Sequence, residues 1–177
     1  IEQTRVIARR FDERYGRVDP AYPIFPEPES LLSRSGTILG LDGNKMSKSR
    51  GNTIELGMTA DETAKLLKRA VTDSDRHITY DPVNRPEISN LVNIAAMCLD
   101  RAPEDVAEEI GDGGGGGLKK LVTVAVNDHF AAHRARRSEL MADPGILRDV
   151  LRAGNERANA VAEATLAEVR QTMSMDY

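Results

Sequence analysis

Cysteine, aromatic rings and long apolar runs are all scarce in this sequence. Its 177 residues include one cysteine, no tryptophan and 4% aromatic residues. A single thiol excludes a disulfide framework, and because Cys98 lies within the apolar run Ile94–Leu99 we expect it in the core. With so few rings, aliphatic side chains must form most of that core. No stretch approaches the roughly 20 apolar residues of a membrane-spanning helix, so we expect no membrane partner.

The sequence also lacks an excess of positive charge and a secretory leader. A formal net charge of −4 argues against a protein that binds nucleic acid with its whole surface, although a local basic face stays possible. Without a leader we expect a reducing, cytoplasmic setting. The chain starts at Ile1 in what reads as a helix already under way, so we interpret it as a piece of a larger protein.

The first third of the chain is predicted to contain a helix, a connection and a short strand. Apolar residues recur every four positions up to about Tyr15, and Gly16 is a natural helix stop. Four prolines within residues 20–30 predict an extended surface connection. Thr37–Leu41 is then expected to form a strand that ends in a turn at Asp42–Gly43.

Helices are predicted for the middle of the chain. A capping box at Thr59–Glu62 begins one over about 60–71, and a first-turn proline begins another over about 86–99. Between them, 72–86 should be a polar connection, and a short helix should run over 103–111. The side chains expected to face the core are Leu66, Leu67, Ala70, Leu91, Ile94, Ala95 and Cys98.

The run Gly113–Gly117 is predicted to be a flexible connector. It formally satisfies a dinucleotide-binding pattern, but it follows a predicted helix rather than a strand and lacks the acidic residue that should follow. After it we expect two long helices, about 118–141 and 144–173, packed as a hairpin within a bundle. The second carries an apolar stripe at three- and four-residue steps from Leu147 to Met173.

The most specific feature is the lysine motif, residues 45–52, which reads Lys-Met-Ser-Lys-Ser-Arg-Gly-Asn. Lysine is a point charge on a flexible stem, so Lys45 and Lys48 could follow phosphate oxygens during a reaction. Ser47 and Ser49 add hydroxyl donors, and Gly51 permits unusual torsions. This composition is typical of a mobile loop that closes over a triphosphate. The alternative is a solvated basic turn.

With its flanks, the lysine motif resembles the bacterial tryptophanyl-tRNA synthetases, which are class I aminoacyl-tRNA synthetases. The resemblance runs from the first residue to about Met173. It implies a predominantly helical chain, with the end of a Rossmann-like α/β nucleotide-binding domain over 1–58 and an all-α domain of the tRNA anticodon-binding type over 59–177. The strings that carry it are Ile1–Arg5, Pro26–Pro28, Gly40–Gly43, Ala70–Ser74 and Ile88–Asn93.

The resemblance also implies a reaction in which a carboxylate attacks the α-phosphate of ATP. Lys45 and Lys48 would be the catalytic residues, because they would hold the leaving pyrophosphate. Ser47 and Ser49 would bind phosphate oxygens, Met46 would touch the nucleotide, and the Ile38 backbone would contact adenine. The implied cofactor is ATP with Mg²⁺ as a substrate complex, with no metal bound by this chain. The nucleotide-binding residues would be Ile38, Lys45, Met46, Ser47, Lys48 and Ser49.

One part of the family pattern is missing. The histidine-glycine-histidine signature is absent, and His77, His129 and His133 stand in other settings. That signature and the tryptophan pocket would lie before Ile1, so we expect the chain alone to be inactive. The complete enzyme would use ATP, L-tryptophan and tRNA, would be a homodimer, and would have no DNA or membrane partner.

The segment His133–Arg137 is the most basic cluster near the C-terminus. Arg134, Arg136 and Arg137 would form a solvated face or, by the resemblance, would position phosphates of the tRNA anticodon. His129 and Arg136 fall on nearly the same side of the predicted helix, where they would either meet acids of the last helix, such as Glu156 or Glu163, or line a groove open to a ligand. His129 and His133 have a metal-compatible spacing but no convincing third ligand, which favours a structural pair. Two rival functions stay open: a tyrosyl-type class I synthetase, and a paralogue that serves as a binding or regulatory module.

Overall fold

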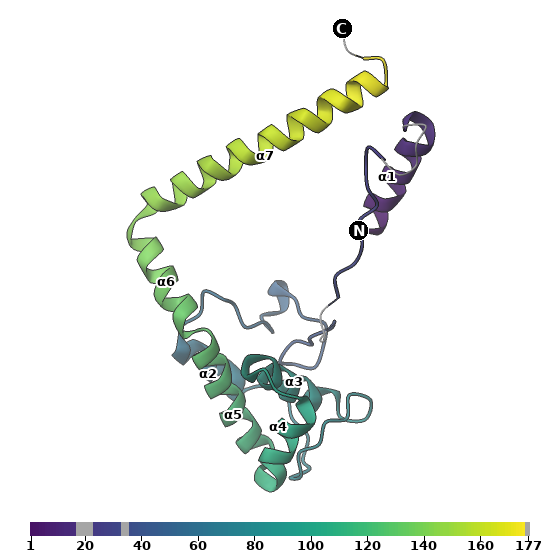
Figure 1. Cartoon of the computed structure of the whole chain (residues 1–177). Coiled ribbons are helices and arrows are strands. Elements are labelled where there is room, and N and C mark those ends of the chain that lie inside the picture. Colours follow the sequence, from purple (N-terminus) through teal and green to yellow (C-terminus); the bar gives the residue numbers. More distant parts are fainter. Residues whose placement is uncertain (17–22, 33–35, 176–177) are drawn as a thin grey trace. The chain divides into compact units, whose positions relative to one another are not determined.

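The computed structural model describes residues 1–16, 23–32 and 36–175. Within these ranges the chain is mostly helical and contains no β-strand, and no helix is long and apolar enough to span a membrane. The chain divides into two compact units, one of residues 1–32 and 142–177 and the other of residues 33–141. In chain order (Figure 1), the elements are α1 (Glu2–Tyr15), η1 (Lys48–Arg50), α2 (Ala60–Lys68), α3 (Pro86–Leu99), α4 (Pro103–Ile110), η2 (Gly111–Gly113), α5 (Gly114–His129), α6 (Ala131–Ala142) and α7 (Pro144–Thr172).

In the first unit, α1 confirms the predicted N-terminal helix, and the described part of the proline-rich connection packs back on it. The Asp12 carboxylate accepts hydrogen bonds from the backbone N–H groups of Ile24 and Phe25, at 3.1 and 3.2 Å. The Phe11 ring lies 4.9 Å from that of Phe25. Residues 20–22 of the predicted connection lie outside the described residues.

The predicted C-terminal helix is confirmed as α7. Pro144 occupies its first turn and the Asp143 side chain accepts a hydrogen bond from the Gly145 N–H. None of its residues is buried, and Val150 and Val161 of the predicted stripe are 62% and 69% exposed. The predicted packing of this helix on the one before it stays a prediction.

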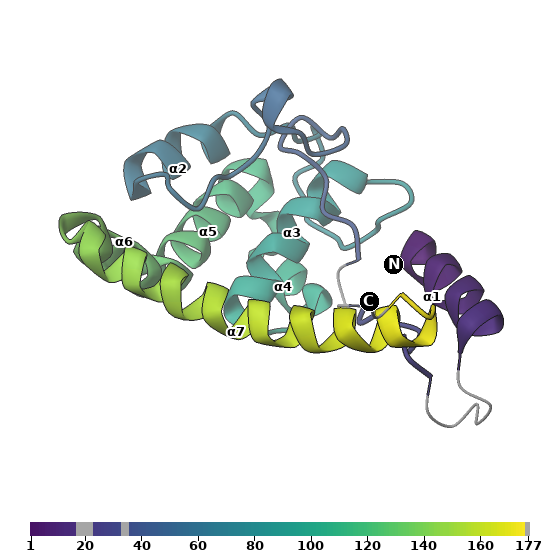
Figure 2. The same cartoon turned by 90° about the horizontal axis from the view of Figure 1, so that it is seen from above.

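The core of the second unit lies between α3 and α5. These two helices lie side by side in both views (Figures 1 and 2), with α2 packed on α5 and α4 packed on α3. The core is aliphatic, as the composition requires. Its fully buried apolar side chains are Leu67, Ile78, Ile88, Leu91, Val92, Ala95, Val106, Leu118 and Val122, with Val126 close to α6.

Local sequence signals set the ends of the helices in this unit. The capping box is formed as predicted: Thr59 accepts from the Glu62 N–H, and the Glu62 carboxylate accepts from the Thr59 N–H. Pro86 starts α3, which ends at Leu99 as expected. The polar connection 72–86 is also confirmed, and Arg85 fixes it by donating to both carboxylate oxygens of Asp73 at 2.8 Å.

The strand predicted at Thr37–Leu41 is wrong, and with it the α/β part of the predicted fold is not confirmed. Residue pair Leu39 and Lys45 forms an isolated antiparallel bridge, but no neighbouring strand is present among the described residues. The segment is extended, as its short apolar run indicates, but it is not part of a sheet. Its backbone groups are paired instead with Asn90, Asn44, Asn52 and Val71.

The glycine run is not a flexible connector, because Gly114–Gly117 form the first turn of α5. Glycine has a low helix propensity, so this turn needs a stabilising cause outside the run. Gly114 has a φ of +65°, and a methyl group on Gly115 would lie 2.9 Å from Thr72 Oγ1. Close packing on the neighbouring connection therefore overrides the low helix propensity of glycine.

The helix predicted over 118–141 is two helices, α5 and α6, which meet at Phe130. The interruption is slight, since the Phe130 N–H still donates to the Val126 carbonyl at 3.1 Å. The domain boundary predicted at residue 58 falls inside the second compact unit. That boundary refers to the complete enzyme and stays a prediction.

Candidate functional site

Residues 37–44 lead into the lysine motif and are fixed to α3 by one side chain. Asn90 accepts from the Leu39 N–H at 2.8 Å and donates to the Leu39 carbonyl at 3.1 Å. Asn90 is 8% exposed, so its amide is paired away from most of the solvent. Two residues later, the Leu41 side chain enters the core and its carbonyl accepts from the Val71 N–H at 2.8 Å. The motif therefore starts from a firmly held segment.

The turn predicted at Asp42–Gly43 is confirmed. The Gly43 N–H donates to the Gly40 carbonyl at 2.9 Å, and Gly43 has a φ of +77°, which favours glycine. The Asp42 carboxylate accepts from the Asn52 side chain at 2.7 Å and from the Asn44 N–H at 3.1 Å. These two donors, Asn52 first, hold the pKa of the Asp42 carboxyl below its ordinary value.

The lysine motif itself forms a short exposed excursion. Its middle, Lys48–Arg50, is a single 3₁₀ turn, and Gly51 closes it with a φ of +64°. Lys45, Lys48 and Ser49 are exposed. The Ser47 and Ser49 hydroxyls are hydrogen-bonded to each other at 2.8 Å. The motif thus presents three cations, Lys45, Lys48 and Arg50, and the Ser49 hydroxyl to solvent on one short stretch of chain.

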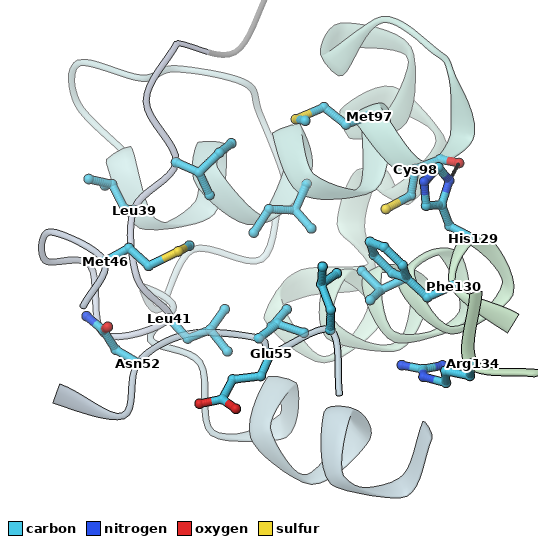
Figure 3. Close-up of a pocket in the computed structure, with 15 residues that line it drawn as sticks. Leu39, Leu41, Met46, Asn52, Glu55, Met97, Cys98, His129, Phe130 and Arg134 are labelled. Carbon is cyan, nitrogen blue, oxygen red and sulfur yellow. Dashed lines mark hydrogen bonds between the residues drawn. The ribbon is translucent and has the colours of Figure 1, made fainter. Parts of the chain in front are cut away.

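Beneath the motif lies an apolar pocket of about 250 Å³, here called the inner pocket. Figure 3 shows Met46 on one side of it and Cys98, His129 and Phe130 on the opposite side. Ile38 and Met46, both assigned to the nucleotide by resemblance, line it together. Its other walls are formed by Leu39, Leu41, Asn52, Ile54, Glu55, Leu56, Ile94, Met97, Val126 and Arg134.

A second, shallower pocket of about 570 Å³, the outer pocket, lies on the other side of Met46. Ser47 and Lys48 line this pocket with the following segment 53–57, and neither lines the inner one. Met46 and residues 54–56 line both pockets and so separate them. The structure therefore places an apolar pocket next to a pocket that Lys48 lines, and Met46 lines both.

The segment that follows the motif is fixed at its far end by Arg134 of α6. The guanidinium donates to the Met58 carbonyl at 3.0 Å, to Thr63 Oγ1 at 3.1 Å and to the Asn127 carbonyl at 3.3 Å. Each of these acceptors comes from a different stretch of the chain. Arg134 therefore has a structural role in joining α2, α5 and the segment after the motif.

The other two predicted nucleic-acid contacts differ from Arg134. Arg136 is exposed and pairs with Glu139 of its own helix at 2.8 Å. The Arg137 guanidinium lies beside Gly57, at the end of the outer pocket. The alternative in which Arg136 meets acids of the last helix, such as Glu156 or Glu163, stays a prediction.

The histidines and the cysteine have structural partners. His129 Nδ1 lies 3.2 Å from the Cys98 carbonyl oxygen, and His77 pairs with Asp112 at 2.8 Å. Cys98 is half-buried, so it packs against the core and also lines the inner pocket, and burial raises the pKa of its thiol. In the part of the chain that the structure describes, no three His, Cys, Asp or Glu side chains gather as metal ligands would.

Two asparagines were given no role from the sequence. Asn90 falls on the buried face of α3, one position before Leu91 and four before Ile94, where a polar residue needs a partner. That pattern was available as a signal. Asn52 is 5% exposed and ends the lysine motif, where the sequence alone gives no sign that its side chain turns inward.

Comparison with known proteins identifies a family that this chain matches. Residues 1–131 match the model of a family described as tRNA synthetases class I (W and Y). The tryptophan–tRNA ligase of Thermosynechococcus vestitus is 39% identical over 176 residues, which cover 96% of this chain and 53% of the relative. This chain therefore spans about half the length of the curated relatives it matches.

Solved structures give the same picture. Tryptophanyl-tRNA synthetase from Campylobacter jejuni, crystallised with ADP and tryptophan, matches 96% of this chain and 52% of its own with a TM-score of 0.66 and 28% identity. The enzyme from Mycoplasma pneumoniae matches 98% of this chain and 52% of its own with a TM-score of 0.79. At 21% identity, that second likeness concerns the fold alone.

Proposed function

The chain belongs to the family of class I tRNA synthetases for tryptophan and tyrosine, and we propose that it works as part of a tryptophan–tRNA ligase. The observation that carries the proposal is its 39% identity to such a ligase over 96% of this chain. Because the chain spans about half of that relative, the remaining active-site groups would come from residues outside it. The complete ligase would be a cytoplasmic homodimer that uses Mg-ATP, L-tryptophan and tRNA.

In this proposal, residues 1–58 are the end of the nucleotide-binding domain and residues 59–177 are the helical, tRNA-binding domain. The lysine motif would stand between them, at the point where ATP is bound. Its exposure and its position over two pockets support this role. The adenine end of the nucleotide would contact the Ile38 backbone, and Met46 would touch the nucleotide beside it.

The chemistry is a displacement at phosphorus. The tryptophan carboxylate attacks the α-phosphate of ATP, the bond to the β-phosphate oxygen breaks, and pyrophosphate leaves. No side chain has to accept a proton, so the protein contributes position and charge. Lys45 and Lys48 would hold the departing pyrophosphate more tightly in the transition state than in bound ATP, and only that difference raises the rate.

The serines would complete the phosphate site. The Ser47 and Ser49 hydroxyls are hydrogen-bonded to each other at 2.8 Å, and on binding each would turn its O–H toward a phosphate oxygen. Lys48 and Ser47 face the outer pocket together, which supports a phosphate position there. In the second step, the aminoacyl adenylate would pass tryptophan to tRNA, with Arg136 and Arg137 as the candidate phosphate contacts of the helical domain.

The test is tryptophan-dependent exchange of labelled pyrophosphate into ATP. The complete ligase should catalyse it, and the 177-residue chain alone should not. Lys45→Ala and Lys48→Ala in the complete ligase should each lower kcat by about 10² to 10³, the usual cost of losing one donor to developing charge. Lys120→Ala is the matched control, since this exposed lysine of α5 lines neither pocket.

Each other outcome removes a part of the proposal. Exchange with tyrosine but not tryptophan would show the other specificity that the family includes. Exchange with neither amino acid would favour a binding or regulatory module. Exchange by the chain alone would show that it carries a whole active site, and equal losses from the lysine variants and Lys120→Ala would remove the catalytic role of the motif.

A further inference from the structure

We propose that Asn52 is a positioning residue that anchors the base of the lysine motif, so that Lys45 acts from a fixed base and Lys48 from a movable tip. The inference rests on the proposed function. The Asn52 side chain accepts from the Ser47 N–H at 2.9 Å and donates to the Lys45 carbonyl at 3.2 Å and to Asp42 Oδ1 at 2.7 Å. One amide thus holds the chain on both sides of Met46.

The contacts require an asparagine. A backbone N–H can only donate, and an ionised carboxylate can only accept, so the orientation of the Asn52 amide is determined by its partners. Aspartate would keep the acceptor for Ser47 but would have no donor for Asp42 or for the Lys45 carbonyl. Alanine would remove every one of these contacts. A longer side chain meets a tight wall, because even a methyl group on Gly40 would lie 2.1 Å from Asn52 Nδ2.

The anchor is itself held in place. Asn52 is 5% exposed, and its carbonyl accepts from the Leu41 N–H at 3.0 Å. Leu41 belongs to the core of the second unit. Residues 45–47 are therefore connected through Asn52 to the core.

The tip of the motif has weaker support. Residues 48–51 are closed by the Arg50 N–H to the Ser47 carbonyl at 3.2 Å and by the Gly51 N–H to the Lys48 carbonyl at 3.1 Å. Both bonds lie in an exposed turn, where water competes. Closure over the pyrophosphate would then move Lys48 while Lys45 keeps its place. Lys45 would then be a positive charge already in position before the reaction, and Lys48 would be a positive charge that arrives when the tip closes.

Hydrogen exchange on the 177-residue chain tests the anchor without any substrate. In the wild type the Ser47 amide should exchange at least tenfold more slowly than the Ser49 amide, after correction for intrinsic rates. Asn52→Ala should abolish that difference. Asn44→Ala is the matched control, because this neighbouring amide contacts Asp42 but neither Lys45 nor Ser47. Protection of Ser47 that survives Asn52→Ala would overturn the proposal.

Pyrophosphate exchange by the complete ligase tests the functional half. Asn52→Ala and Asn52→Asp should each lower kcat tenfold or more with the KM for tryptophan unchanged, since only the pyrophosphate contacts are disturbed. Asp42→Asn combined with Asn52→Asp should recover part of the loss, because the amide and carboxylate have exchanged places. A purely structural role would instead raise both KM values or give no recovery, and either result would overturn the proposal.

A second variant reaches the same contact without touching Asn52. Gly40→Ala should displace the Asn52 amide and reproduce the loss of Ser47 protection, even if Asn52→Ala fails to fold. Normal Ser47 protection in Gly40→Ala would contradict the anchor. If the wild-type ligase shows no exchange with tryptophan or tyrosine, the proposed function fails, while the hydrogen-exchange result still decides whether Asn52 anchors the motif.

Discussion

Replacing Asn90 by alanine should destabilise the second unit, because this side chain takes the place of a strand neighbour for the segment that leads into the motif. The substitution removes two hydrogen bonds: the one that the Asn90 side chain donates to the Leu39 carbonyl at 3.1 Å, and the one that it accepts from the Leu39 N–H at 2.8 Å. Each hydrogen bond contributes about 1 kcal/mol net, and a backbone group left unpaired costs about 1–3 kcal/mol more if water cannot reach it. Leu39 is half-buried, so partial access of water places the expected loss at about 2–3 kcal/mol.

Urea unfolding followed by far-UV circular dichroism measures this loss. With a slope of about 1–3 kcal/mol per molar urea, the midpoint should fall by about 1 M. Amide exchange gives a local reading: at about 1.4 kcal/mol per factor of ten, the Leu39 and Leu41 amides should exchange about 30- to 150-fold faster. Both readings come from the 177-residue chain, so neither depends on the proposed activity.

Asn84→Ala is the control, since its amide bonds the Asp81 carboxylate three residues away on an exposed turn. It should cost less than about 0.5 kcal/mol, as surface changes usually do. A loss below about 0.5 kcal/mol for Asn90→Ala, or equal losses for the two variants, would refute the reasoning. It would mean that the extended segment is held by the burial of Leu41 rather than by the amide.

Further predictions concern the arginines and the acid limit of stability. Arg136→Glu with Arg137→Glu should lower aminoacylation of tRNA by the complete ligase with pyrophosphate exchange unchanged, whereas Arg134→Met should lower the urea midpoint of the chain. Unchanged aminoacylation in the first variant would remove the nucleic-acid role. The Arg85 guanidinium holds the pKa of the Asp73 carboxyl below its ordinary value, so this pair stabilises the fold above the unfolded pKa of about 3.9 and is lost as pH falls further. Asp73→Asn should therefore lower the midpoint at pH 6 and reduce the difference between pH 6 and pH 3, and an unreduced difference would contradict this.

Elements with local causes could be predicted from the sequence. The capping box depends on two side chains three residues apart, and the start of α3 depends on the fixed torsion of Pro86. Both signals act within one turn of helix. The helix ends that were predicted wrongly depend on residues elsewhere in the chain. One example is the first turn of α5, where Gly115 packs against Thr72.

The strand at 37–41 could not be decided from its own residues, because a strand exists only with a partner. The short apolar run predicts an extended backbone, and the structure has one. Its N–H and carbonyl groups can pair with another strand or with a side chain, and residues distant in sequence decide which. Here the partner is Asn90, 51 residues away.

The candidate site shows the same division. The lysine motif could be located from the sequence, since its residue types are unusual and adjacent. The structure adds that Met46 separates two pockets and that Arg134 fixes the segment after the motif. Neither could be predicted, because each depends on helices that are remote in sequence. The catalytic roles of Lys45 and Lys48 stay predictions.

Two buried asparagines together explain how an exposed cationic loop keeps a defined shape when the described residues contain no strand beside it. Asn90 pairs the backbone of the segment that enters the motif, and Asn52 pairs the backbone of Lys45 and Ser47 at its base. Each amide offers donors and an acceptor on one short, rigid group, which a carboxylate or a hydroxyl cannot match. Two like charges placed three residues apart repel, so a free loop would spread them. Fixing residues 45–47 while leaving 48–51 to weak local bonds holds one charge in position and lets the other move.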